Sequence, residues 1–353
     1  MRKTCLPQFT AACFALTAVC AFSTAASAQQ KIGETLEEII ELAKQEPTVT
    51  LATTWEGPII EFEQKAFKEK YGIDFEFVFV TGIESRERIF NESLSGVNEI
   101  DLVNMSSGLA DKFIEAGLNV PVDYAALFPG LLPEIVSPDK YYIATGWNQF
   151  VLVYNPTMVS EEDAPKDWQD CLDPKWKGQK LAVYTRPLPF IQPYFKWGED
   201  EAVKYHTALK EQEPVWTSST NTTVALNAAG EYPVVCGIHY HAVKNVLRDD
   251  PNAPIKWVIP KLFAVQPGES LTLMKDADSP NAAILLAGFL ATDGAPGYDL
   301  YGRSNPFVEG TDAWNYAREA GATPYWSGWE NGGDRQAAAS KKIVETWGFP
   351  KAN

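Results

Sequence analysis

The stretch YYIATGWNQFVLVYNP, residues 141–156, decides the fold that we predict for this chain. It is rich in aromatic and β-branched residues, and it ends in an Asn-Pro turn signal. At roughly 3.3 Å per residue, an extended segment of this length reaches about 50 Å, well beyond an ordinary strand of five or six residues. A strand this long can leave one lobe and enter the next. We therefore expect two lobes with a ligand cleft beside the crossover; the alternative is a strand and a loop inside one large domain.

The N-terminal segment has the pattern of a secretory signal peptide. Two basic residues near the start are followed by an apolar run over residues 11–22 and by Ala26-Ser27-Ala28. A basic start, a short apolar middle and an A-x-A end are typical of export signals, and the run is too short to span a bilayer. We therefore predict that residues 1–28 are a signal peptide, that the protein is periplasmic and that it has no stable membrane insertion.

Composition limits the partners that the chain can have. The 353 residues include 46 Asp and Glu against 30 Lys and Arg, a net charge of −16. Such a surface repels nucleic acid and anionic lipid, so we expect neither as a partner. The length suits two domains that each bury a core of their own. We expect the protein to be a monomer.

Two cysteines, Cys171 and Cys236, lie outside the predicted signal peptide. An even pair in an oxidising compartment favours a disulfide bond between them. The alternative is that both are small buried apolar side chains. The chain has no CxxC spacing, so the cysteines do not indicate a metal site.

Strand and helix patterns alternate after residue 48. Alternating apolar residues over 48–53 and 73–79 predict strands, and a helix pattern lies between them, opening at Pro58 and ending at Gly72. The same order recurs through residues 85–95 and 100–104, which predicts an α/β fold with a parallel sheet. Ligands bind at the carboxyl ends of such strands. The candidate ligand-binding residues in the loops that follow these ends are Thr54, Trp55, Glu56, Ser106 and Ser107.

Four segments resemble the extracellular solute-binding proteins of bacterial ABC importers, in the branch that contains the ferric-iron binders. They are FEQKAFKEKYGIDFEF (62–77), VLVYNP (151–156), DAPKDWQDCLDPKWKGQKLAV (163–183) and GEYPVVCGIHYHAVKN (230–245). The resemblance implies a type II periplasmic binding protein, in which two Rossmann-like lobes joined by two crossing strands close on a ligand by hinge motion. It implies an N-lobe of residues 29–148 plus 268–312 and a C-lobe of residues 149–267 plus 313–353.

The sequence His239-Tyr240-His241 falls at a predicted strand-to-helix turn that should face the cleft. In the ferric-binding relatives the matching turn supplies two consecutive tyrosines; Tyr240 matches the first, and His241 stands at the second. The relatives' N-lobe histidine falls in the loop of residues 53–56, where Glu56 is the plausible substitute. Tyr240, His241 and Glu56 are therefore the candidate metal ligands, although imidazole suits softer metals better than ferric iron. The alternative is that His239, Tyr240 and His241 bind an organic ligand or cap the helix.

Tryptophans near the predicted cleft favour an organic ligand. Trp55 follows the first strand, Trp147 lies in the crossover next to Asn148, and Trp326 and Trp329 lie in the tail. Indole faces can hold organic cations or stack on planar rings. We include Trp147 and Asn148 among the candidate ligand-binding residues; for any single tryptophan the alternative is packing.

Polar residues at a strand end and a helix start of the second lobe could bind an anion. Arg186 ends a predicted strand, and Ser219 and Thr220 open the helix that follows. Hydroxyls, helix N–H groups and a guanidinium suit a carboxylate or a phosphonate. The alternatives are a surface ion pair for Arg186 and an N-cap for the hydroxyls.

These patterns predict a periplasmic substrate-binding component of an ABC transporter, which delivers a small polar solute to a permease and its ATPase. We prefer an organic solute such as a polyamine, a thiamine-like cation or a phosphonate; ferric iron or another metal ion is the alternative, and no other cofactor is expected. An exported metal-dependent hydrolase built on His239, His241 and Glu56 is the rival class. Because HExxH, GxSxG, P-loop and dinucleotide motifs are absent from the sequence, we expect no enzyme. A sensory receptor with the same fold is a third possibility.

Overall fold

The computed structural model describes residues 31–55, 57–80, 82–97, 99–104, 110–292 and 295–349. The predicted signal peptide, residues 1–28, lies outside the described residues, as do the candidate site residues Glu56, Ser106 and Ser107. In the part of the chain that the structure describes, no helix has the length and apolar character needed to cross a membrane.

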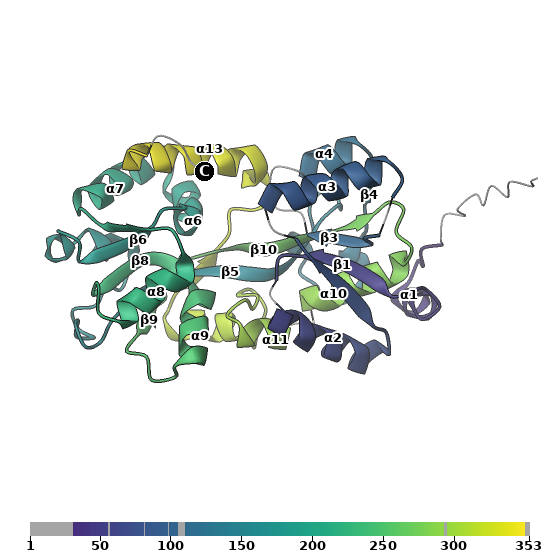
Figure 1. Ribbon diagram of the computed structural model, residues 1–353, viewed down its shortest axis with the longest axis horizontal. Helices are drawn as coiled ribbons and strands as arrows, with labels where there is room; N and C mark the ends of the chain where they lie inside the picture. The colour runs from purple at the N-terminus through teal and green to yellow at the C-terminus, as the bar shows by residue number, and fades with distance from the viewer. Residues whose placement is uncertain are drawn as a thin grey trace, which may run out of the picture. The chain divides into compact units, whose positions relative to one another are not determined.

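Two long antiparallel strands connect the two lobes. Strand β5 spans Ile143–Tyr154 and strand β10 spans Leu262–Met274, and they pair from Ile143 with Leu271 to Gln149 with Val265. The first half of β5 pairs with β10, and its second half pairs with strands of the second lobe. Figure 1 shows the two strands side by side between the sheets of the lobes. The predicted crossover over residues 141–156 is therefore confirmed.

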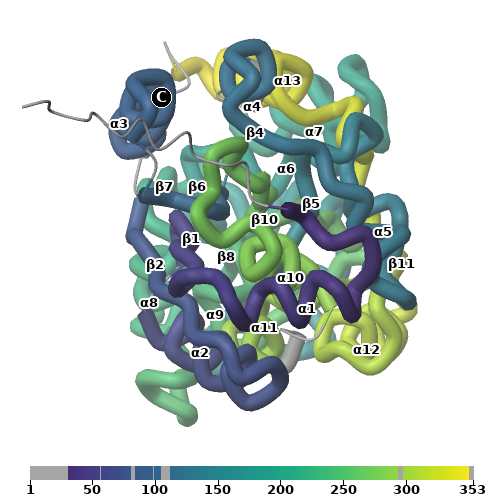
Figure 2. Tube along the Cα trace, turned by 90° about the vertical axis from the view of Figure 1, so that its right-hand side faces the viewer, coloured from purple at the N-terminus to yellow at the C-terminus, as the bar shows by residue number. Residues whose placement is uncertain are grey.

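The first lobe is a mixed sheet covered by helices on both faces, in which β1, β2 and β3 are parallel and β10 runs antiparallel to β3 and β4. Its strands follow the order β2-β1-β3-β10, and β4 also pairs with β10. The strands are β1 (Val49–Thr53), β2 (Phe75–Phe79), β3 (Leu102–Asn104) and β4 (Asn119–Val120). The helices are α1 (Leu36–Ala43), α2 (Gly57–Tyr71), α3 (Gly82–Leu94), α4 (Ala110–Glu115), α5 (Tyr124–Leu127), η1 (Pro133–Ile135), α10 (Pro280–Thr292) and α11 (Ala295–Leu300). Figures 1 and 2 show α3 and α4 on one face and α2 and α10 on the other, which explains why β1 is largely buried.

The second lobe continues the sheet beyond β5 in the order β8-β6-β7, while β9 pairs with β5 and β11 with β10. The strands are β6 (Leu181–Tyr184), β7 (Val215–Thr217), β8 (Val234–His239), β9 (Lys256–Val258) and β11 (Thr323–Tyr325). The remaining helices are η2 (Trp168–Leu172), η3 (Pro174–Trp176), α6 (Leu188–Trp197), α7 (Glu199–Glu211), α8 (Thr220–Ala228), α9 (Tyr240–Asp249), α12 (Asp312–Glu319), η4 (Trp329–Asn331) and α13 (Gly333–Trp347). In Figure 1, α6, α7 and α13 lie on one side of β6 and β8, and α8 and α9 lie on the other.

Cys171 and Cys236 form a disulfide bond, as the sequence favours, with their Cα atoms 6.0 Å apart. Cys171 belongs to η2 and Cys236 to β8, and both are fully buried. The bond therefore ties the segment before β6 to the strand that ends at His239.

Glu63 of α2 is a buried carboxyl in the first lobe. It is 0% exposed, and neither of its carboxyl oxygens has a hydrogen-bond partner among the described residues. A Cβ added at Gly297 would lie 2.0 Å from Oε1, so the backbone of α11 packs directly against this group. Burial raises the pKa of Glu63 to about 8, and the carboxyl is therefore mostly protonated at neutral pH.

We expect Glu63→Gln to raise the free energy of unfolding by roughly 4 kcal/mol at pH 8.5 and by less than about 1 kcal/mol at pH 5. In the native state the Glu63 carboxyl stays protonated up to about pH 8, whereas in the unfolded chain it loses its proton above the ordinary pKa of 4.5. The stability of the natural protein therefore falls as the pH rises from 4.5 to 8. An amide of the same shape does not titrate. Urea unfolding at several pH values, with the exposed Glu61→Gln as the control, measures the effect; a gain that did not grow with pH would contradict it.

Candidate functional site

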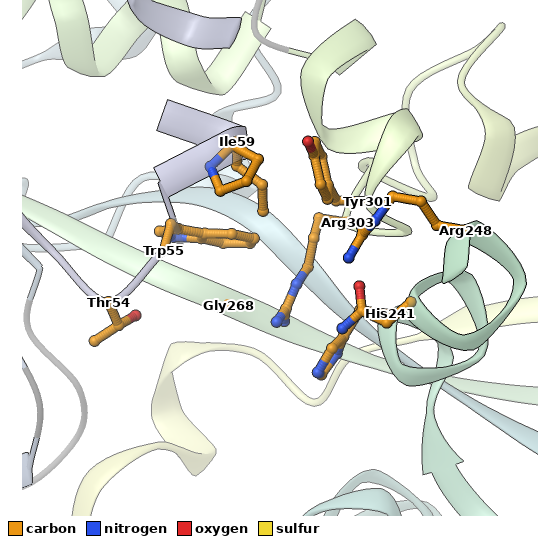
Figure 3. Close-up of a pocket in the computed structure, with 10 residues that line it drawn as sticks. Thr54, Trp55, Ile59, His241, Arg248, Gly268, Tyr301 and Arg303 are labelled. Carbon is orange, nitrogen blue, oxygen red and sulfur yellow. The ribbon is translucent and has the colours of Figure 1, made fainter. Parts of the chain in front are cut away.

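A small cavity of about 100 Å³ lies between the loop after β1 and helix α9. Its lining comes from these two elements, the start of α2, strand β10 and the segment after α11. Figure 3 shows the side chains of Trp55, Arg303 and His241 converging from separate elements, with Arg248 and Tyr301 beside them.

Two glycines in the crossing strands leave room for the ring of Trp55. Gly146 and Gly268 lie between the paired residues of β5 and β10, and Gly146 has a positive φ of 49°. A Cβ at Gly146 would lie 2.6 Å from the Trp55 ring, and one at Gly268 would lie 3.1 Å from it. Side chains at these positions would therefore displace the indole, on whose face the guanidinium of Arg303 stacks at 4.5 Å from a ring centroid.

The small cavity is positively charged. Arg303 stacks on Trp55 and donates from Nη1 to Oδ1 of Asn148, while Arg248 lies over the ring of Tyr301 at 5.2 Å. Burial, together with the nearby charge of Arg303, holds the pKa of His241 well below its usual value, so this imidazole is neutral. Among the described residues that line the cavity, none is acidic.

Glu269 is the buried carboxyl next to Gly268. Its Oε1 accepts hydrogen bonds from Thr53 Oγ1 (2.5 Å), Asn104 Nδ2 (3.0 Å) and the Thr54 amide (3.3 Å). Burial raises the pKa of Glu269 to about 7, against the opposing effect of the hydrogen bonds from Thr53 and Thr54 and of the nearby charges of Arg303 and Arg86. Glu269 therefore joins the ends of β1 and β3 to β10, and so fixes the start of the loop that carries Trp55.

A second, larger cavity of about 620 Å³ shares Gly268 with the small one. Trp326 packs edge-on against Trp147 and Trp329, with ring centroids 5.4 Å apart in both pairs. Trp329 stacks on Tyr142 at 6.5 Å, and its Nε1 donates to the carbonyl of Glu134 at 2.9 Å. The lining of the large cavity includes Tyr142, Asn148, Leu188, Gln266, Trp326 and Trp329.

The C-terminal segment that carries these tryptophans contacts both lobes. Trp329 is bonded to Glu134 of η1 in the first lobe, and the amide of Ser327 donates to Oε1 of Gln192 in α6 at 2.8 Å. Helix α13 then packs against α7. The segment is therefore a noncovalent link between the lobes in addition to β5 and β10.

The cavities contain four of the residues predicted from the sequence. Thr54, Trp55 and His241 line the small cavity, and Asn148 lines the large one. Their positions agree with a role in ligand binding, which stays a prediction.

Three other predicted residues are buried and line neither cavity. His239 packs between Phe150 and Tyr184, with ring centroids at 4.8 and 6.1 Å. Trp147 packs on Phe307 and Trp326, and Tyr240 packs on Trp257 and Tyr316. Burial raises the pKa of the Tyr240 phenol, which disfavours the phenolate that ferric iron would require.

The remaining predicted residues either line neither cavity or lie outside the described part of the chain. Arg186 and Ser219 are exposed, Thr220 is half-buried, and none of the three lines a cavity. Ser219 is the N-cap of α8, with its side chain accepting from the Thr222 amide. Glu56, Ser106 and Ser107 are not described. Within the described residues, no group of three His, Cys, Asp or Glu side chains forms a metal site.

Sequence reasoning missed the two arginines of the small cavity, Arg248 and Arg303. Arg303 lies in the segment Tyr301-Gly302-Arg303-Ser304-Asn305-Pro306, whose glycine and Asn-Pro residues indicate a turn. A lone arginine between aromatic residues and such a turn is a weak signal for a site. Its role depends on contact with Trp55, which is distant in the sequence.

The fold and the paired cavities define a two-lobe binding protein, and the family follows from the sequence match. The model of the bacterial extracellular solute-binding protein family matches residues 98–282, more than half of the chain, and the protein belongs to this family. The resemblance to extracellular solute-binding proteins, predicted from the sequence, is confirmed. The prediction that the protein binds a solute and is not an enzyme is confirmed as well.

Solved structures share the fold at low sequence identity. Iron-bound HitA from Pseudomonas aeruginosa is 18% identical with a TM-score of 0.64, and 85% of this chain matches 99% of that chain. Apo FutA2 from Synechocystis PCC6803 is also 18% identical, with a TM-score of 0.66 over 86% of this chain and 99% of that chain. PotD from Streptococcus pneumoniae, a spermidine/putrescine ABC transporter substrate-binding protein in complex with calcium and HEPES, is 16% identical, with a TM-score of 0.61 over 86% and 99%. The predicted type II fold with two α/β lobes is therefore confirmed.

Proposed function

We propose that the protein captures a small organic anion in the periplasm and delivers it to an ABC permease. The observation that supports this proposal most strongly is the charge of the small cavity. Arg248 and Arg303 line it, whereas the chain as a whole carries a net charge of −16. Positive charge in a cleft of an acidic protein attracts an anion and repels a cation.

The donors of the small cavity suit an oxyanion. A guanidinium offers parallel N–H groups that match a carboxylate or a phosphonate, and such charge-assisted bonds are roughly twice as strong as neutral ones. The stacking of Arg303 on Trp55 and its bond to Asn148 hold the guanidinium in place before a ligand arrives. His241, held neutral, retains one N–H donor for a further oxygen.

The same charges disfavour the cationic candidates. A polyamine or a thiamine-like cation would approach Arg303 and Arg248, and a metal ion would meet the same repulsion. Glu269 is a weak counter-charge because burial raises its pKa to about 7, so that the carboxyl is partly protonated at neutral pH. Of the ligands proposed from the sequence, the phosphonate is the one that this site supports, and a carboxylate fits for the same reason.

A ligand screen tests the proposal. We expect methylphosphonate or a short carboxylate, at about 100 times its Kd, to stabilise the protein by about 2.7 kcal/mol in thermal unfolding, and spermidine and thiamine to have no such effect. Native mass spectrometry of protein purified without unfolding shows what it retains. Two results would contradict the proposal. One is stabilisation by spermidine together with no stabilisation by any anion. The other is a retained ferric ion that shows the colour of an iron–phenolate complex.

A further inference from the structure

The large cavity has the size of a site for an organic ligand. Its volume of about 620 Å³ lies within the range of roughly 300–1,000 Å³ that is typical of small-molecule pockets. Inorganic phosphate or a metal ion would leave most of this space empty. An anion bound in the small cavity would also leave the large cavity empty, unless the rest of that molecule extended into the large cavity.

The two cavities are neighbours, connected by the contact between Arg303 and Asn148. Both cavities include Gly268. Arg303 lines the small cavity and donates to Asn148, which lines the large one. An anion bound to the guanidinium of Arg303 would therefore lie next to a side chain that lines the large cavity.

The large cavity has an aromatic wall with fixed geometry. Trp326 is held by edge-on contacts with Trp147 and Trp329, and Trp329 is held by Tyr142 and by its bond to Glu134. Leu188 adds apolar surface to the lining. Because these contacts hold the indole rings in place, the wall favours a ligand with a planar apolar group.

Gln266 supplies an unused acceptor in the same cavity. It is 8% exposed, lines the cavity, and its Oε1 is buried with no hydrogen-bond partner among the described residues. A buried acceptor without a partner is destabilising, so nearly all such groups in native proteins are satisfied by protein, water or ligand. A donor on a bound molecule would satisfy this one.

We infer that the ligand is an amphipathic organic anion, with an acidic head bound at Arg303 and a planar apolar body placed against Trp326. A hydrogen-bond donor on the body would reach Gln266. This inference rests on the proposed function, and it names the class of anion that the protein carries.

Titration calorimetry with phenylphosphonate, methylphosphonate and benzyl alcohol tests the inference on the full mature chain. We expect phenylphosphonate to bind at least about 10-fold tighter than methylphosphonate, because burial of a ring adds apolar contact. Trp326→Leu should weaken phenylphosphonate binding more than methylphosphonate binding, so that the preference falls to about 2-fold. Trp314→Leu, which changes a half-buried tryptophan outside both cavities, should leave the preference unchanged.

The outcomes separate the inference from the proposal on which it rests. Equal affinity for the two phosphonates would overturn the inference and leave anion capture intact. Benzyl alcohol binding as tightly as phenylphosphonate would overturn it as well, because the acidic head would then contribute nothing. If neither phosphonate binds and spermidine does, the proposed function itself is wrong. Thermal unfolding of Trp326→Leu without a ligand shows whether the variant is folded.

Discussion

Arg303→Gln is expected to weaken anion binding by roughly 100-fold, because removal of one partner from a desolvated charge pair costs about 2–5 kcal/mol. Arg303 stacks on Trp55, bonds to Asn148 and lines the small cavity. Glutamine keeps a hydrogen-bond donor but loses the charge and the parallel pair of N–H groups. Calorimetry with methylphosphonate measures the loss directly.

Two further variants show whether the loss comes from the charge at this position. Arg303→Lys keeps the positive charge but loses the parallel pair of N–H groups. We therefore expect an intermediate loss of anion affinity of about 10-fold. Arg318→Gln is a matched control, since the Arg318 guanidinium also stacks on a tryptophan, Trp314, at 4.6 Å, but lines neither cavity. The pKa of His241, followed by NMR, should rise in Arg303→Gln because a nearby positive charge has been removed. Unchanged affinity in Arg303→Gln would refute the proposed site.

The double variant Cys171→Ala and Cys236→Ala is expected to lower the free energy of unfolding by about 2–4 kcal/mol. The bond closes a loop between cysteines that are 65 positions apart, and its removal enlarges the set of unfolded conformations. Because both side chains are fully buried, alanine avoids the burial of an unpaired hydroxyl. Urea unfolding measures the change.

Reduction of the natural protein provides the control for the double variant. Dithiothreitol should lower the stability of the natural protein toward that of the variant and should leave the variant itself unchanged. An equal effect of dithiothreitol on both proteins would show that the loss does not come from the disulfide. Because β8 ends at His239, we also expect weaker ligand binding when the bond is absent, by less than the effect of Arg303→Gln.

Local patterns were sufficient to predict the framework of the fold. The aromatic and β-branched run over residues 141–156 became β5, and the alternating segments near residues 50 and 75 became the parallel pair β1 and β2. Each of these segments shows its periodicity within a few residues. The loop that carries Thr54 and Trp55 could be predicted as a site because strand ends of a parallel sheet bind ligands.

The details of the site depend on contacts that the sequence does not show. Trp55 and Arg303 are far apart along the chain, and their contact depends on the glycines of the crossing strands. The turn at residues 239–241 illustrates a second difficulty. Successive residues of a helix point about 100° apart, so Tyr240 packs inward while His241 reaches the cavity. Three consecutive residues at such a turn cannot all face the same ligand.

The link made by the C-terminal segment offers a way to test for the hinge motion that the family resemblance implies. Trp329 is anchored to η1 of the first lobe by its indole N–H, while the neighbouring Ser327 is anchored to α6 of the second. Any swing of one lobe against the other changes the surroundings of this indole, and indole emission depends on hydrogen bonding and on stacked neighbours. Because the sequence contains 11 tryptophans, a comparison of the natural protein with Trp329→Phe is needed to assign a change in emission to Trp329.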